Sequence, residues 1–109
     1  MTREDIADMI EEIGLPCAYY QFPEDTEQAP PFVVFFYANN DGFFADNSNY
    51  AKVEVLNVEL YTAERDFEQE EAVEAVLDEY GFTYSKDPAY IGDERMWQIA
   101  YEMEVLING

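Results

Sequence analysis

The segment RMWQIAYEMEVLI, residues 95–107, alternates large apolar side chains with polar or small ones along its whole length. Successive side chains of a β-strand point to opposite faces, so this period of two predicts a long strand with one buried face and one wet face. Such a strand is stable only within a sheet whose apolar face is covered. The apolar set is Trp97, Ile99, Tyr101, Met103, Val105 and Ile107, and it alternates with Gln98, Ala100, Glu102 and Glu104.

Two segments, residues 2–13 and 66–80, carry apolar side chains at helical spacing instead. Each begins at a residue that caps helices well, Thr2 or Asp66, with a carboxylate or amide side chain three positions later. Each is also followed by a glycine, which readily takes the left-handed conformation that ends a helix. We therefore expect two amphipathic helices.

Four further segments are predicted strands, and with the two helices and the strand at 95–107 they give the order α-β-β-β-α-β-β. These segments are 17–22, 32–38, about 50–62, and 82–86, the last followed by a turn over 87–94. The fold class is therefore α+β, a single domain over 1–109 in which two helices pack on one face of a mainly antiparallel sheet.

Two of these strands have unusual patterns. FVVFFYA at 32–38 is apolar on both faces, which predicts a central strand covered on both sides. In the strand at 50–62, Val53 and Val55 share one face, whereas Val58 and Leu60 share the other. This change of phase suggests a β-bulge or a change of partner.

Composition excludes several classes of function. A net charge of −20, from 25 acidic and 5 basic residues, opposes contact with nucleic-acid phosphates or anionic membranes. No signal peptide or membrane span is expected, because the start is charged and the longest apolar run is short. A single cysteine, Cys17, excludes an internal disulfide, so a cytosolic protein is expected.

The chain offers few parts for catalysis. It has no histidine, so no Ser–His or Cys–His pair can form, and a zinc site of the usual kind is implausible. Cys17 is expected to be a packed thiol, and Glu102 with Glu104 lies on a solvated strand face. Oxygen ligands in the loop at 39–50 (Asp41, Asp46 and Asn49) lack EF-hand spacing and suggest at most a weak cation site. We expect no enzyme activity, no cofactor and no metal.

The loop NNDGFFADNSNY, residues 39–50, places Phe43 and Phe44 among polar and small residues. Aromatic side chains are enriched at protein–protein interfaces, and nine Tyr, eight Phe and one Trp are more than a small core readily hides. The sequence therefore predicts that this loop contacts another protein. The candidate interface residues are Phe43, Phe44, Asp46, Asn47 and Tyr50.

Several short motifs resemble those of small structural proteins of tailed phages and prophages, in the tail-terminator, tail-completion or head–tail joining group. The motifs are VELYT at 58–62, ADN at 45–47 and YIGDERMWQIAYEMEVLI at 90–107, together with an opening helix, GLP and an acidic, proline-flanked loop at 23–31. The resemblance implies an α+β subunit of a ring, usually of six copies, that caps the tail tube and faces the head connector. It also implies loops at 23–31 and 39–50 that contact neighbouring proteins, with assembly in the host cytoplasm.

Two alternatives remain open at this stage. An acidic DNA mimic that inhibits a DNA-binding protein would share the length and the charge, and it would present rows of carboxylates on the two helices. Another acidic protein-binding module is the second alternative. Neither requires catalytic residues or a sequence-specific contact with nucleic acid.

Overall fold

The computed structural model describes residues 1–23, 28–38 and 52–107. Within these described residues five strands form one sheet in the order β1-β2-β3-β5-β4, in which only the β1–β2 pair is parallel. The predicted α+β class and element order are confirmed. In chain order the elements are α1 (Arg3–Glu11), β1 (Cys17–Tyr19), β2 (Phe32–Ala38), β3 (Lys52–Thr62), α2 (Phe67–Glu79), β4 (Ser85–Ile91) and β5 (Met96–Ile107).

The long alternating segment forms β5, an interior strand with one buried and one exposed face, as its pattern predicts. β5 pairs with β3 without interruption, from Lys52 opposite Ile107 to Thr62 opposite Trp97. Its apolar face is buried from Ile99 to Ile107, whereas Glu102 and Glu104 on the other face are exposed.

The helices begin where their caps predict. The hydroxyl of Thr2 accepts a hydrogen bond from the Asp5 amide (3.0 Å), and the Asp5 carboxylate accepts one from the Thr2 amide (2.9 Å). At α2, Asp66 accepts from the Gln69 amide (3.1 Å). These bonds satisfy amide groups that have no partner within the first helical turn.

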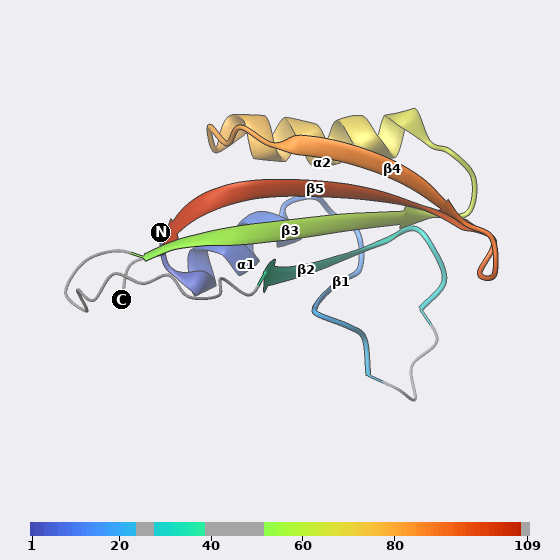
Figure 1. Ribbon diagram of the computed structural model, residues 1–109, viewed down its shortest axis with the longest axis horizontal. Helices are drawn as coiled ribbons and strands as arrows, with labels where there is room; N and C mark the ends of the chain where they lie inside the picture. Colours follow the sequence, from blue (N-terminus) through green and yellow to red (C-terminus); the bar gives the residue numbers. More distant parts are fainter. Residues whose placement is uncertain (24–27, 39–51, 108–109) are drawn as a thin grey trace.

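Both helices cover the same face of the sheet, and the core lies between the helices and this face. Figure 1 shows α2 along β4 and β5, and α1 behind β3. Arg3 of α1 pairs with Glu54 of β3, and Tyr101 of β5 donates to Glu74 of α2 (2.7 Å). The buried core consists of Ile6, Met9, Ile10, Val33, Phe35, Leu56, Val58, Leu60, Val73, Leu77, Ile99, Tyr101, Met103, Val105 and Ile107.

The predicted bulge in β3 is wrong. Its register against β5 is continuous, and Val53 and Val55 lie on the helix-free face, where Val53 is 52% exposed. The two phases in the sequence are therefore the two faces of one regular strand, each carrying apolar residues.

Other boundaries also differ from the predictions. The last hairpin pairs Ser85–Ile91 with β5 and turns at 92–95, so the strand predicted at 82–86 begins later and includes Pro88. An edge strand tolerates proline because one side of its backbone needs no partner. β1 ends at Tyr19, because Tyr20 takes a positive φ of 70° and turns the chain.

Candidate protein-binding face

Aromatic side chains gather on the face of the sheet that the helices leave uncovered. Phe32 of β2 stacks on Tyr61 of β3, with ring centroids 4.9 Å apart and planes 22° apart. Phe22 meets Phe32 edge-on at 5.4 Å, and Tyr20 meets Phe36 edge-on at 6.1 Å. We call these five residues the aromatic patch. None of the five belongs to the core cluster beneath the helices.

The turn at Tyr20 brings the chain across this face. Its amide donates to the Phe35 carbonyl (2.8 Å), and the Gln21 amide donates to the Tyr19 carbonyl (2.8 Å). The tight bend carries Tyr20 and Phe22 over β2 rather than along its edge. Tyr20 nevertheless remains 65% exposed. The prediction for β2 is confirmed in its main point, since no residue of this interior strand is exposed, but its second face is covered by side chains instead of an element.

A cavity of about 300 Å³ opens within the aromatic patch. Its walls are aromatic and apolar, and two carboxylates, Glu59 and Glu94, stand among them. The lining residues are Tyr20, Gln21, Phe22, Gln28, Phe32, Val34, Glu59, Tyr61, Glu94 and Met96. None of the basic side chains in the described part of the chain lines this cavity.

A hydrogen-bond chain fixes one wall of the cavity. The Gln98 side-chain amide donates to the Tyr61 hydroxyl (2.7 Å), which donates to Oε1 of Glu59 (2.9 Å). The pKa of Tyr61 is raised to about 12, mainly by burial and in smaller part by the Glu59 carboxylate, although the hydrogen bond from Gln98 acts to lower it. Tyr61 is therefore a fixed donor at neutral pH, and one oxygen of Glu59 is left for another donor.

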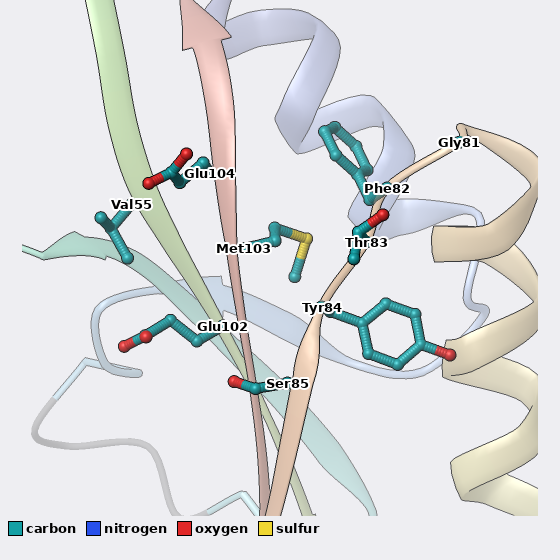
Figure 2. Close-up of a pocket in the computed structure, with 9 residues that line it drawn as sticks. All are labelled: Val55, Gly81, Phe82, Thr83, Tyr84, Ser85, Glu102, Met103 and Glu104. Atoms are coloured by element: carbon teal, nitrogen blue, oxygen red, sulfur yellow. The ribbon is translucent and has the colours of Figure 1, made fainter.

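A larger cavity, of about 700 Å³, lies at the other end of β5 (Figure 2). Here β5 continues beyond Glu102, its last β4-paired residue, while residues 81–84 run away from it toward α2. Figure 2 shows Met103 extending toward Phe82 and Thr83, with Glu102 and Glu104 on the opposite side of the strand. The two carboxylates of this cavity, Glu102 and Glu104, are exposed, whereas Met103 belongs to the core and Phe82 and Tyr84 pack against it.

A buried ion-pair network occupies the sheet face under α2. Glu70, 1% exposed, is bound by Arg65 Nε (2.6 Å) and Lys86 Nζ (2.9 Å). Lys86 also pairs with Glu74 (2.7 Å), which accepts from Tyr101. Burial alone would raise the pKa of Glu70, but its bonds to Arg65 and Lys86 prevail and lower it. This network joins α2 to β4 and β5 rather than presenting charge to solvent.

The predicted interface residues, Phe43, Phe44, Asp46, Asn47 and Tyr50, lie outside the described residues, as does the weak cation site suggested for Asp41, Asp46 and Asn49. They therefore stay predictions. Among the described residues no group of three or more His, Cys, Asp or Glu side chains could hold a metal ion. Cys17 packs against the core, and burial raises the pKa of its thiol.

Sequence reasoning missed the aromatic patch, although two signals pointed to it. CAYYQF at 17–22 is rich in aromatics, and FVVFFYA at 32–38 is apolar on both faces. The first was predicted as a short strand and the second as a strand covered on both sides; in the structure Tyr20 is exposed, while Phe22, Phe32 and Phe36 are half-buried outside the core. No helix in the described part of the chain is long and apolar enough to cross a membrane.

No protein-family model matches the chain, and no curated protein is significantly similar to it.

Proposed function

We propose that this protein is a structural subunit of a phage or prophage virion, a tail terminator or tail-completion protein that forms a ring at the head–tail junction. The observation that carries the proposal is the helix-free sheet face, which carries the aromatic patch near one end and exposed apolar side chains near the other. Val53 and Leu106, paired across β3 and β5, are 52% and 57% exposed. Exposed apolar groups gathered on one face are typical of surfaces that bind other proteins.

The charge fits such a role. Arg3, Arg65 and Lys86 are bound to Glu54, Glu70 and Glu74 of their own chain, which cancels equal numbers of positive and negative charges and leaves the net charge at −20. A negative lining around a DNA channel repels phosphates and lets DNA slide. The α+β order of the structure agrees with what the sequence resemblance implies.

The DNA-mimic alternative receives less support. Of the six carboxylates counted on the second helix, Glu70 and Glu74 turn inward and are neutralised by Arg65 and Lys86. A mimic needs an unbroken row of free charges on one surface, and this row is interrupted. The acidic residues that remain exposed on α2 are Glu68, Glu71, Asp78 and Glu79.

Light scattering on a sizing column tests the ring, across protein concentration and at low and high salt. We expect a closed oligomer of about six subunits, favoured by concentration. Added salt should strengthen it, because repulsion between acidic subunits is screened within about 10 Å at 0.1 M ionic strength. A monomer under all of these conditions would contradict the proposal. A complex with a basic protein that weakens with salt would favour the mimic.

A pair of variants tests which face makes the contact. Leu106→Asp places a charge on the helix-free face, and Phe67→Asp places one at the start of α2, where the side chain is 61% exposed. We expect Leu106→Asp to shift the oligomer toward monomer while Phe67→Asp leaves its mass unchanged. The opposite pattern would assign the contact to the helix layer. In the same assay Phe43→Asp combined with Phe44→Asp tests the loop predicted from the sequence.

A further inference from the structure

We propose that the cavity in the aromatic patch binds the guanidinium group of an arginine side chain presented by a partner protein. The inference does not depend on ring formation, because all the groups that build the cavity belong to one copy of the chain.

The walls suit a flat cation. Four aromatic rings, those of Tyr20, Phe22, Phe32 and Tyr61, line the cavity, and Met96 adds a polarisable side chain. The faces of aromatic rings attract cations, and a guanidinium stacks on them more readily than an ammonium does. The stacked Phe32 and Tyr61 rings and the edge-on Phe22 hold this wall in place without help from a ligand.

The charges in the cavity require a cationic ligand. Glu59 and Glu94 line it, and no basic side chain of the described chain does. Tyr61 donates to only one oxygen of Glu59, which leaves the other oxygen for an N–H donor. The chain's own Arg3, Arg65 and Lys86 are held elsewhere by Glu54, Glu70 and Glu74. Arg95, exposed in the turn before β5, is not among the residues that line the cavity, and Lys52 begins β3 at the end opposite Tyr61. A cation that fills the cavity would therefore come from another molecule.

The size and setting favour a side chain over a free metabolite. A cavity of about 300 Å³ lies at the lower limit of small-molecule sites. It opens on the aromatic patch, where Tyr20 is 65% exposed, so a bound protein would gain apolar contacts around the inserted arginine. Interface arginines inserted among aromatic rings are frequent energetic centres of binding.

The probe is the blocked tripeptide glycyl-arginyl-glycine, titrated into the isotope-labelled protein while methionine methyl signals are followed by NMR. We expect the Met96 methyl signal to shift and to saturate as the peptide concentration is raised to about 50 mM, because one inserted side chain supports an affinity in this range. The methyl groups of Met9 and Met103, 0% and 3% exposed in the core, should not move. They also report that each variant remains folded.

Three carboxylate variants distinguish binding of the peptide at this cavity from general electrostatic attraction of a cationic peptide to an acidic protein. Glu59→Gln and Glu94→Gln should each weaken binding about tenfold, because each removes a charge-assisted bond. Glu59→Gln keeps an acceptor for the Tyr61 hydroxyl. Glu102→Gln is the matched control, since Glu102 is exposed on the same face but lies outside this cavity. Equal weakening in all three would overturn the proposal.

Peptide controls test the chemistry of the ligand. The lysine and glutamine versions of the tripeptide should bind more weakly than the arginine version. Equal binding of the lysine version would overturn the assignment to a guanidinium, and equal binding of the glutamine version would show that charge is not recognised. The absence of any saturable shift at Met96 would refute the site itself. A monomeric protein that binds the arginine peptide would refute the ring and leave this inference intact.

Discussion

Leu60→Ala is expected to lower the free energy of unfolding by about 3 kcal/mol, the usual cost of removing a fully buried leucine from a core that cannot collapse around the cavity. Leu60 is 0% exposed and lies in β3 between Val33 of β2 and Ile99 of β5. Since a domain of this size has roughly 5–15 kcal/mol of stability, the loss is a large fraction of the total. The melting temperature should fall by on the order of 15 °C.

Leu106→Ala is the matched control for this experiment. Leu106 lies on the neighbouring strand but on the helix-free face, and it is 57% exposed. The same substitution should therefore cost less than about 0.5 kcal/mol. Urea unfolding at low protein concentration measures both variants as monomers. If both variants lost a comparable free energy of unfolding, the helix-free face would be as well packed as the core, which would contradict this fold.

Glu70→Gln is the second substitution with a large expected effect, a loss of about 2 kcal/mol at neutral pH. The change keeps the size of the side chain but removes the buried charge that binds Arg65 and Lys86. Breaking a buried ion pair costs about 3–5 kcal/mol, and the expected loss is smaller here because both cations are partly exposed. Glu71→Gln, exposed at the next position of α2, is the control and should change little.

The loss at Glu70 should depend on pH in a defined direction. Its pKa is lowered in the folded protein from the ordinary value of 4.5, so the ionised form stabilises the fold. This contribution is complete above about pH 4.5 and disappears as the pH falls through the folded-state pKa. Wild type and Glu70→Gln should therefore converge in stability in acid. A difference between them that stays constant down to low pH would contradict this role.

The sequence predicted those parts of the fold that depend on local pattern. Alternation predicted β5, and capping residues with a following glycine predicted both helices, because these signals lie within a few residues of one another. The predicted start of β4 was wrong, because pairing with β5 and not local propensity determines that Ser85–Ile91 forms this strand. The phase change in β3 was misread for a related reason: a single strand gives no indication that both faces of its sheet carry apolar groups.

The candidate site was less predictable than the fold. Tyr20, Phe32 and Tyr61 come from three separate segments, and only the turn at Tyr20 and the β2–β3 register bring them together. Likewise, nothing in the sequence distinguishes Glu70 from the surface carboxylates of the same acidic helix. Its burial depends on Arg65 and on Lys86, which arrives from a strand that follows the helix.

Pro88 in the edge strand β4 limits how copies of this chain can associate. A proline has no amide hydrogen to donate, and Lys86 and Asp87 beside it add charge, so this edge is a poor template for another strand. At the opposite edge, β1 has only three residues. The sheet therefore cannot grow strand by strand into an open-ended fibre. Any assembly must use side chains on a face, a mode of contact that can close on itself and stop at a fixed number of copies.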